Sequence, residues 1–506
     1  MRDLIQKILK ISGPPGTGKT TRLLNEVDRA LATGLLPDEI IFTSFTRAAA
    51  NEARDRACTK FQLEQDSFRW FGTLHSLCFR NISPVAVMQG KHLCEFGKLM
   101  GLCFTIRSDS DGWRGNTKGD NLMSLFQFAR AWMIPLEEML LRCKDFGFLD
   151  SYPPAEVDHF ARSLIEFKSS KGLVDFTDIL EIWLQNGKVP HHRLLIGDEA
   201  QDFSPLQWKV FERLGQRSER IVVAGDDDQA IHEWNGAKAS SFIDLGGACE
   251  VLPQSYRIPA QVHRLAADVS GRISRRIPKE YQARGSEGSV VRTSDLTSLD
   301  VSKGQWLLLA RNVCFLEEYV QLCYLRGVLF ESDSVQGTDW SVVRAVRSWK
   351  LLMDGKAITK PEAVDMYRYM KTRDRIVWGM KEQLDQAPDG RVFTLAQLRK
   401  EYGLKAIGSW EEALNLIDPD DHAFIRTAEE NGELAMPAPR IRISTIHGAK
   451  GREAENVAVI CDMTLRTFDA YSRNPDWEHR VFYVAITRAK ENLFLVHPRT
   501  NTAYNL

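Results

Sequence analysis

The sequence predicts an α/β protein with two lobes built on parallel sheets, each carrying a mostly helical insertion. Short β-rich runs alternate with amphipathic stretches, which is the pattern of parallel strands connected by helices. The alternation occurs twice, before and after about residue 254, and a long helical stretch interrupts each half. A chain of 506 residues also exceeds the length of one ordinary domain, so several folding units are expected.

The first half begins with a strand at 7–12, which leads through a glycine-rich loop into a helix from about Lys19. A helix is expected over 47–56, and further strands are expected at 39–45, 194–197 and 220–224. In the second half, we expect a helix over 314–326. The strands expected there are 305–310, 328–331, 440–444, 457–461 and 492–496.

These elements predict a division into four parts. The first lobe comprises 1–83 and 168–253, with a helical insertion at 84–167. The second lobe comprises 254–335 and 440–506, with a helical insertion at 336–439 that contains turn signals at 387–390 and 418–420.

The composition is that of a globular protein, with 43% hydrophobic and 26% charged residues. A net charge of −1 gives no global basic signal, although a local positive groove remains compatible with it. The nine cysteines include no pair with CxxC spacing, which favours a reduced chain over a disulfide framework or zinc site. No apolar run is long enough to span a bilayer, so we expect a cytoplasmic protein of a bacterial or phage-infected cell, with no membrane partner.

A phosphate-binding loop follows the first strand and precedes the first helix. The residues that match GxxxxGK[ST] are Gly13, Pro14, Pro15, Gly16, Thr17, Gly18, Lys19 and Thr20. Glycines let backbone N–H groups turn toward a phosphate, and the N-terminus of the following helix favours negative charge. We therefore expect ATP binding, with Lys19 at the β- and γ-phosphates and the Thr20 hydroxyl on Mg²⁺.

A second acidic element narrows the chemistry. The apolar run Leu194–Gly197 leads into adjacent carboxylates, Asp198 and Glu199. Asp198 can join the Mg²⁺ shell, while Glu199 can accept a proton from an attacking water. Acidic pairs at strand ends also occur as solvated caps, but together with an upstream phosphate loop they favour hydrolysis.

Five stretches, met in chain order, resemble the motifs of the UvrD/Rep/PcrA group of superfamily 1 helicases. They are Asp198-Glu199-Ala200-Gln201-Asp202 (a DExQD box), Gly225–Gln229 (GDxxQ), Gln254-Ser255-Tyr256-Arg257 (QxYR), Thr445–Glu453 (TxHxAKGxE) and Val484–Ala489 (VxxTRA). The resemblance runs from residue 13 to about 496 and implies two RecA-like P-loop lobes. The two helical insertions are covered by position only.

The resemblance also assigns roles at the nucleotide. It implies that Gln229 senses the γ-phosphate, that Tyr256 stacks on adenine, and that Arg257 and Arg488 act as arginine fingers. Glu453 joins the nucleotide contacts. Thr21 stands where relatives carry an adenine-packing arginine, and the adjacent Arg22 is the expected substitute. The upstream glutamine motif of the family has only Gln6 as a counterpart, so adenine specificity is less firmly indicated than hydrolysis.

Weaker matches indicate a single-stranded DNA track. The residues expected to contact DNA are Ser44, Phe45, Thr73, His75, Phe176, Trp234 and His447. Aromatic rings beside hydroxyl and cationic groups suit a strand whose bases stack and whose phosphates accept hydrogen bonds. Phe45 and Phe176 could equally be core aromatics, and the two histidines could be packing residues. His232 replaces a family tyrosine in the third motif.

The resemblance implies an ATP-dependent DNA helicase or translocase that moves 3′ to 5′ on single-stranded DNA and at junctions with duplex. Two alternatives stay open: a translocase that displaces proteins with little unwinding, and an ATPase subunit of a nuclease or defence complex. The second insertion is shorter than in bacterial relatives, and the family's strand-separating hairpin has no evident counterpart after Arg488. We expect a monomer and a disordered terminus around Tyr504. A protein partner, such as a nuclease or a replication or repair protein, stays open.

Overall fold

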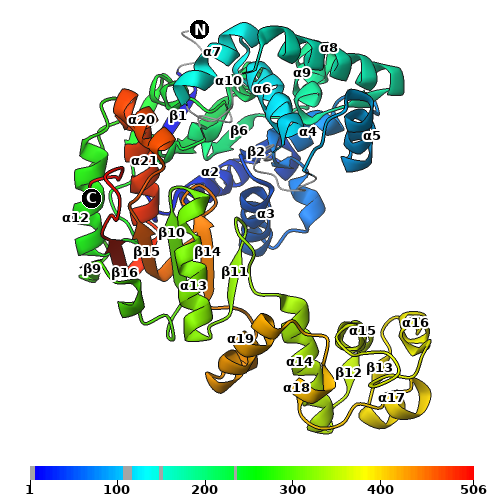
Figure 1. Cartoon of the computed structure of the whole chain (residues 1–506). Helices are drawn as coiled ribbons and strands as arrows, with labels where there is room; N and C mark the ends of the chain where they lie inside the picture. Colours follow the sequence, from blue (N-terminus) through cyan, green and yellow to red (C-terminus); the bar gives the residue numbers. More distant parts are fainter. Residues whose placement is uncertain (1–5, 106–116, 147–151, 233–235) are drawn as a thin grey trace. The chain divides into compact units, whose positions relative to one another are not determined.

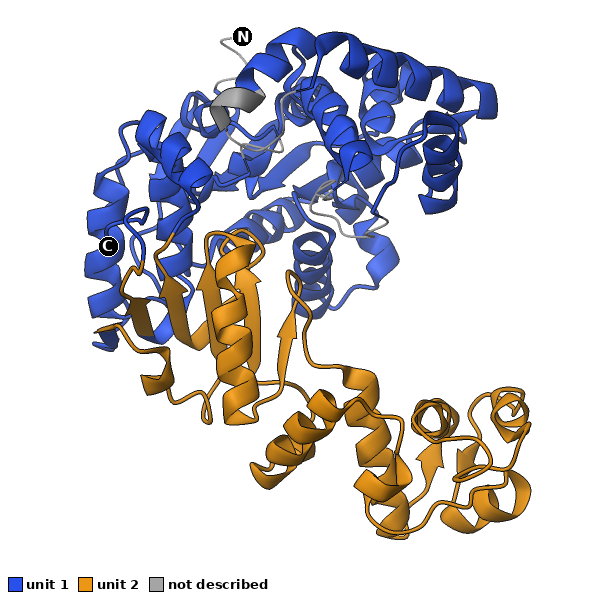
Figure 2. Ribbon diagram, in the orientation of Figure 1, with its two compact units in different colours: residues 1–290, 463–492, 500–506 blue, residues 291–462, 493–499 orange. Residues whose placement is uncertain are grey.

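The computed structural model describes residues 6–105, 117–146, 152–232 and 236–506. These residues form two compact units (Figure 2). Unit 1 comprises residues 1–290, 463–492 and 500–506, and unit 2 comprises 291–462 and 493–499.

Unit 1 is built on a six-stranded sheet in the order β3-β2-β6-β7-β1-β8, and every neighbouring pair is parallel. The strands are β1 (Ile8–Ser12), β2 (Ile40–Ser44), β3 (Phe71–Gly72), β6 (Leu194–Asp198), β7 (Arg220–Gly225) and β8 (Ala248–Val251). Parallel strands place their carboxyl ends at one edge of the sheet, so the loops after β1, β2, β6 and β7 meet there.

Both faces of this sheet are covered by helices, which explains why its strands are continuous apolar runs. Along β6, Leu194 and Ile196 face a core shared with α2 (Lys19–Ala32) and α3 (Arg47–Phe61). Leu195 faces the opposite core, beneath α9 (Phe176–Asn186) and α10 (Pro205–Gly215). The period of two along a strand sends successive side chains to opposite faces.

The remaining helices of unit 1 are grouped by their place in the sequence, and most of them are labelled in Figure 1. An insertion between β3 and β6 contains α5 (Gly90–Met100), α6 (Lys118–Trp132), α7 (Leu136–Phe146) and α8 (Pro154–Lys171), with the short strands β4 (Ala86–Val87) and β5 (Leu173–Val174). The others are α4 (Leu74–Arg80), α11 (Ala239–Ile243), α12 (Ala260–Gly271), α20 (Leu465–Arg473) and α21 (Pro475–Ile486).

A second six-stranded sheet has the order β11-β14-β10-β15-β16-β9. Its strands are β9 (Ser289–Thr293), β10 (Trp306–Ala310), β11 (Phe330–Ser332), β14 (Ile441–Thr445), β15 (Ala454–Ile460) and β16 (Ala489–Val496). The pairs of β10 with β14 and β15, and of β11 with β14, are parallel. The helix α13 (Glu317–Arg326) shares its apolar core.

Unit 2 also carries a mostly helical insertion, between β11 and β14. It contains α14 (Trp340–Met353), α15 (Lys360–Arg368), α16 (Met380–Asp385), α17 (Leu395–Glu401), α18 (Trp410–Ala413) and α19 (Pro419–Glu430). The strands β12 (Ile358–Thr359) and β13 (Val392–Phe393) pair antiparallel within it. None of the described helices of the protein is long and apolar enough to cross a membrane.

The predicted fold class is confirmed: two α/β sheets with parallel strands each carry a mostly helical insertion. The exact four-part division stays a prediction. The compact units group 254–290 and 463–492 with the first sheet, because both segments pack against the loops at its carboxyl edge.

The expectation of a disordered terminus around Tyr504 is wrong. The Tyr504 side chain is 1% exposed, and its ring stacks on Phe482 of α21 with 4.1 Å between centroids. Its hydroxyl lies 2.7 Å from Nδ1 of His479, and Arg272 donates to the carbonyl of Asn505 at 2.6 Å. An aromatic anchor with a polar partner fixes this segment on α21 without any returning strand.

Candidate functional site

The loop after β1 wraps around its own lysine. The Lys19 ammonium donates to the Gly13 carbonyl at 3.0 Å, and the Thr17 hydroxyl donates to Pro14 at 2.8 Å. Gly16 and Gly18 have φ of +73° and +78°, the left-handed region that glycine adopts without strain. The loop therefore has the backbone curvature of a phosphate cradle, and Lys19 occupies its centre.

The QxYR stretch is bound directly to this loop, within unit 1. The Ser255 hydroxyl donates to the Pro15 carbonyl at 2.8 Å, and the Tyr256 N–H donates to the Gly16 carbonyl at 2.9 Å. A Cβ added to Gly16 would lie 2.3 Å from Cβ of Arg257, so only glycine permits this approach. The Tyr256 ring remains 74% exposed, as a ring free to cover a ligand would be. Two of the predicted nucleotide contacts thus lie at the cradle.

Asp198 closes the other side of the loop. The Thr20 hydroxyl donates to its carboxylate at 3.2 Å. Burial, and then the neighbouring Glu199, raise the pKa of Asp198 to about 7, although Lys19 opposes the shift. A bound cation would offset the negative charge that burial and Glu199 disfavour. A buried carboxylate beside a hydroxyl is therefore a donor set that suits a small divalent cation. These two residues therefore fit Mg²⁺.

Glu199 has a strained backbone. Its φ of +52° lies in the left-handed region, which costs a non-glycine residue about 1 kcal/mol. The conformation brings its carboxylate to 3.7 Å from the Lys19 ammonium, and Gln201 donates to it at 2.7 Å. Such strain at a carboxylate beside a phosphate loop is typical of a functional position.

Gln201 begins a chain of hydrogen bonds that joins three predicted motifs. Its amide oxygen accepts from the Asp226 N–H at 3.0 Å, and the Asp226 carboxylate accepts from the Gln229 amide at 2.7 Å. The Gln229 oxygen in turn accepts from the Arg488 guanidinium at 2.8 Å. Arg488 is 2% exposed, so the predicted finger lies buried against the predicted sensor.

A buried charge cluster supports this chain, and sequence reasoning missed it. Three consecutive carboxylates, Asp226, Asp227 and Asp228, lie 3.1, 2.7 and 2.7 Å from the Lys279 ammonium. Burial lowers the pKa of Lys279, but the three carboxylates outweigh it and raise the pKa overall. Arg276 adds a bidentate pair with Asp228 at 2.9 and 2.6 Å. Three buried aspartates in a row are a signal that cations must lie nearby, but not which ones.

The helix α21 is bound to the acidic turn Asp226–Asp228 by hydrogen bonds. Arg480 donates from Nε to the Asp227 carbonyl at 3.0 Å and from a terminal nitrogen to the Arg275 carbonyl at 2.8 Å. Because Arg488 follows α21 by two residues, this anchorage sets where its guanidinium lies. The acidic turn, the cationic segment after α12 and the helix before Arg488 thus form one packed assembly.

Two residues predicted at the nucleotide are engaged elsewhere. Arg22 pairs with Glu250 at 3.0 and 2.8 Å and with Glu26 at 2.6 Å. The hydrogen bond to Glu250, against the effect of burial, raises the pKa of the Arg22 guanidinium. The Thr21 hydroxyl accepts from Arg56 at 2.6 Å. The structure therefore does not bring Thr21 and Arg22 together with Lys19 and Asp198.

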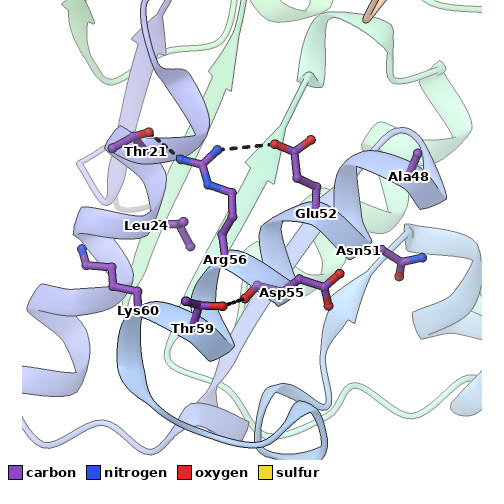
Figure 3. Close-up of a pocket in the computed structure, with 9 residues that line it drawn as sticks. All are labelled: Thr21, Leu24, Ala48, Asn51, Glu52, Asp55, Arg56, Thr59 and Lys60. Carbon is purple, nitrogen blue, oxygen red and sulfur yellow. Dashed lines mark hydrogen bonds and ion pairs between the residues drawn. The ribbon is translucent and has the colours of Figure 1, made fainter. Parts of the chain in front are cut away.

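Thr21 instead faces a pocket of about 760 Å³ between α2 and α3 (Figure 3). Arg56 bridges Thr21 and Glu52 across it, with 3.6 Å to the glutamate. The pocket is lined by Thr21, Leu24, Ala48, Asn51, Glu52, Asp55, Arg56, Thr59 and Lys60. It contains none of the phosphate-loop lysine, Asp198 or Glu199, so it lies beside the nucleotide site and is not part of it.

The loop after β2 holds the first predicted DNA contacts. The half-buried Phe45 ring stacks on His232, with 5.5 Å between centroids. Ser44 is buried and lies opposite Asp198 in the register of β2 and β6. Its contact with DNA stays a prediction. Trp234 lies outside the described residues.

Thr73, His75 and Phe176 come together at a second place in unit 1. Thr73 caps α4 by accepting from the Ser76 N–H at 3.3 Å, and Asp175 caps α9 by accepting from the Asp178 N–H at 2.8 Å. The Phe176 ring is 52% exposed and meets the His75 ring edge-on at 6.1 Å. An apolar ring presented to solvent beside a capped helix end suits a stacking base.

His447 and Glu453 belong to unit 2, in the segment between β14 and β15. His447 is buried, and Glu453 is half-buried. Their contacts with DNA and nucleotide stay predictions.

Comparisons with known proteins place the chain in a family. The model of an AAA domain matches residues 2–235, and the model of a UvrD-like helicase C-terminal domain matches residues 361–500. The chain belongs to the UvrD/Rep/PcrA-like group of superfamily 1 helicases. The resemblance to this family that the sequence motifs indicate is confirmed.

The curated relatives of this UvrD-like chain are distant in sequence. The ATP-dependent DNA helicase PcrA of Leuconostoc citreum is 22% identical over 87% of this chain and 61% of its own length. The DNA helicase II of Haemophilus influenzae is 26% identical over 54% of this chain and 40% of its own length. The chain therefore spans less than two thirds of the length of each of these relatives. The helicase of an arterivirus (nonstructural protein 10) aligns with 98% of this chain and 61% of its own, at 11% identity and a TM-score of 0.35.

Replacing Lys279 of this UvrD-like chain by methionine is expected to destabilise unit 1 strongly. The change leaves three buried carboxylates with one cationic partner, and breaking a buried ion pair costs about 3–5 kcal/mol. Urea unfolding measures the loss. The matched control is Arg264→Met, which removes an exposed cation from its pair with Glu287 and should change little. If both variants lowered the free energy of unfolding by the same small amount, the charge cluster would not stabilise unit 1.

His75 is expected to make folding sensitive to pH. Burial, and then Arg47, lower the pKa of His75 from 6.5 to about 4 in the folded chain. Between these values the unfolded chain binds the proton, so this part of the stability is complete above pH 6.5 and is lost as the pH falls toward 4. His75→Gln should remove a slope of up to about 1.4 kcal/mol per pH unit from the unfolding free energy. A variant whose pH profile parallels the wild type would contradict the depressed pKa.

Proposed function

We propose that this chain is an ATP-dependent DNA helicase or translocase that moves along single-stranded DNA, in the 3′-to-5′ direction. The observation that supports ATP hydrolysis most directly is the continuous set of contacts from Lys19 through Glu199, Gln201, Asp226 and Gln229 to Arg488. The family membership and the relatives, which are DNA helicases by name, support DNA as the track.

Each residue of this set has a chemical task in the proposal. Lys19 binds the β- and γ-phosphates, since it lies at the centre of the cradle. Glu199 accepts a proton from the attacking water, and its left-handed backbone aims the carboxylate into the site. Gln229 orients the water or the γ-phosphate, and Arg257 and Arg488 stabilise the negative charge that develops on the transferred group.

Thr20 and Asp198 would hold Mg²⁺, which supplies charge neutralisation at the phosphate oxygens when it is bound. Their hydroxyl and buried carboxylate are already joined at 3.2 Å. Tyr256 covers the adenine from the exposed side of the cradle, because its backbone is bound to Gly16 and its ring points to solvent.

The DNA part of the proposal depends on the two aromatic pairs of unit 1. Phe45 with His232, and Phe176 with His75, offer rings beside capped helix starts. Each stacked base contributes about 1–3 kcal/mol of binding. Coupling of hydrolysis to stepping between the two RecA-like lobes, the monomeric state and the cytoplasmic location stay predictions, as does any protein partner.

Unwinding of tailed duplexes tests the proposal. Purified chain with ATP and Mg²⁺ is mixed with duplexes carrying a 3′ tail, a 5′ tail or no tail, at several salt concentrations. Separation of the 3′-tailed duplex alone is the expected result. ATP hydrolysis stimulated by single strands without separation of any duplex would support a translocase that displaces proteins. Separation of the 5′-tailed duplex alone would contradict the proposed direction.

A further inference from the structure

An exposed tryptophan stands on the insertion of unit 2, in a part of the chain for which no motif predicts a role. Trp378 is 74% exposed, and its neighbours Val377 and Ile407 are also exposed. They lie in the loop between α15 and α16 and in the loop after α17, which belong to the yellow group of elements in Figure 1. A cluster of exposed apolar residues bordered by polar residues marks an interaction surface more often than a single exposed side chain does.

The exposure does not come from a loose loop. The Val377 N–H donates to the Gly403 carbonyl at 2.9 Å, and the Lys405 N–H donates to the Arg375 carbonyl at 2.8 Å. Beneath them Ile376 and Leu404 pair in a β-bridge and are buried in the core of unit 2. Two anchored backbones thus hold the tryptophan outward.

The two segments that present the indole are rich in cations. Residues 371–378 and 403–407 contain Lys371, Arg373, Arg375 and Lys405, with one carboxylate, Asp374. Asp374 pairs with Lys371 at 3.7 Å, and among the described residues no carboxylate lies within ion-pair distance of Arg373 or Lys405. The Lys405 ammonium approaches the Arg373 carbonyl at 3.4 Å, so the two basic residues are neighbours.

Arg373 is also held in an uncommon backbone conformation. Its φ is +78°, and unlike Gln62 and Met133 it does not cap the end of a helix. A non-glycine residue in the left-handed region is strained, and such strain persists where surrounding structure fixes it. The Arg373 N–H donates to the Ile376 carbonyl at 2.7 Å, which closes the turn that presents the guanidinium.

We propose that this Trp378 surface, made of Lys371, Arg373, Val377, Trp378, Lys405 and Ile407, binds an unpaired stretch of DNA. The indole stacks on a base while Arg373 and Lys405 contact phosphates, a combination that binds single strands with little sequence preference. The choice of DNA as the nucleic acid rests on the proposed function. The surface is additional to the predicted contacts at Phe45, Phe176 and His447.

A single strand fits better than the other polyanions. In a duplex both faces of an internal base are covered by its neighbours, so an indole on a rigid surface has no base to stack on. A protein partner would bury a larger apolar centre with few charges, whereas here only Val377, Trp378 and Ile407 are apolar among several cations. The arrangement of charge and ring therefore favours an unpaired strand.

Binding without nucleotide tests the surface separately from the motor. Anisotropy of labelled oligo-dT is measured with the full chain over a salt series, for wild type, Trp378→Ala, Trp378→Phe and the double variant Arg373→Gln/Lys405→Gln. Trp378→Ala should weaken binding about tenfold, with Trp378→Phe in between. The double variant should lower the slope of log affinity against log salt by about 0.7 for each lost phosphate contact. Lys356→Gln, which removes an exposed cation elsewhere on the same insertion, should bind like wild type.

Three results would overturn the proposal. If the tryptophan variants and the double variant kept the wild-type affinity and salt slope, the surface would have no part in DNA binding. If the variants bound blunt duplex and oligo-dT with equally weakened affinity, the indole would not stack on an unpaired base. A change in self-association of the free chain, with DNA binding intact, would make the surface a protein contact. Thermal unfolding like that of wild type shows that the variants are folded. Failure of DNA-stimulated ATP hydrolysis in the wild type would contradict the proposed function but not this surface, since the binding assay contains no ATP.

Discussion

Glu199→Gln is expected to lower the turnover number for ATP hydrolysis by about 10² to 10⁴, the usual contribution of a general base. The amide has the shape of the carboxylate and can still accept the hydrogen bond that Gln201 donates at 2.7 Å. What it cannot do is take a proton from water. ATP binding should therefore stay near the wild-type value, because Lys19 and the glycine-rich loop are unchanged. Single-turnover hydrolysis and equilibrium binding of a fluorescent ATP analogue measure the two quantities.

A surface carboxylate provides the matched control. Glu219 is exposed and pairs with Arg193 at 2.8 Å. It precedes β7 and so lies at the amino edge of the sheet, opposite the phosphate loop, and Glu219→Gln should hydrolyse ATP like wild type. If Glu199→Gln hydrolysed ATP within a few-fold of wild type, Glu199 would not be the base. A large loss of ATP binding would instead make it a binding residue.

Arg488→Lys should reduce hydrolysis by about 10³ to 10⁵, the range expected for an arginine finger. Lysine keeps the positive charge but lacks the planar fork that lets Arg488 donate to Gln229 at 2.8 Å and to the Val484 carbonyl at 2.9 Å together. The loss should appear in the turnover number more than in ATP affinity, because the charge it stabilises develops in the transition state. Arg193→Lys, at an exposed ion pair, is the control and should have no effect.

A double-mutant cycle sharpens this second expectation. If Gln229 and Arg488 act together, Gln229→Ala combined with Arg488→Lys should cost little more than Arg488→Lys alone. Additive losses would mean that the hydrogen bond between them has no part in hydrolysis. A variant that simply unfolds is recognised by its thermal midpoint, since Arg488 is buried.

The parts of the fold that sequence reasoning predicted are those fixed by local rules. The strand, loop and helix around Lys19 were expected at 7–12 and from Lys19, and β1 covers Ile8–Ser12 and α2 starts at Lys19. A buried parallel strand needs a continuous apolar run, and a phosphate loop needs glycines at its turns. Both requirements are visible in a few consecutive residues.

Other features depended on packing between distant segments. Lys279 meets Asp226–Asp228 across some fifty residues of chain, and no pattern in either segment names the other. β8 was not foreseen, because a short edge strand with exposed residues has no apolar run. Arg22 was expected at the adenine, but it pairs with Glu26 and Glu250. Glu250 is distant in the sequence, so the neighbours of Arg22 in the chain do not reveal this pair.

The same distinction applies to Tyr504. The absence of a returning strand after β16 suggested a disordered terminus, yet stacking on Phe482 and a partner in His479 bury the ring. A single aromatic contact outside regular structure leaves no periodicity to detect. The sequence also left open whether Phe45 and Phe176 are core aromatics or DNA contacts, and Phe176 is the more exposed of the two.

The rate of ATP hydrolysis with and without single-stranded DNA tests the central claim most directly. The account predicts that oligo-dT raises the rate of the wild-type chain, and that Lys19→Ala abolishes both the basal and the stimulated rate while the variant still binds DNA. A wild-type rate that no single strand changes, in a folded chain that hydrolyses ATP, would contradict the claim that this chain is a motor on DNA.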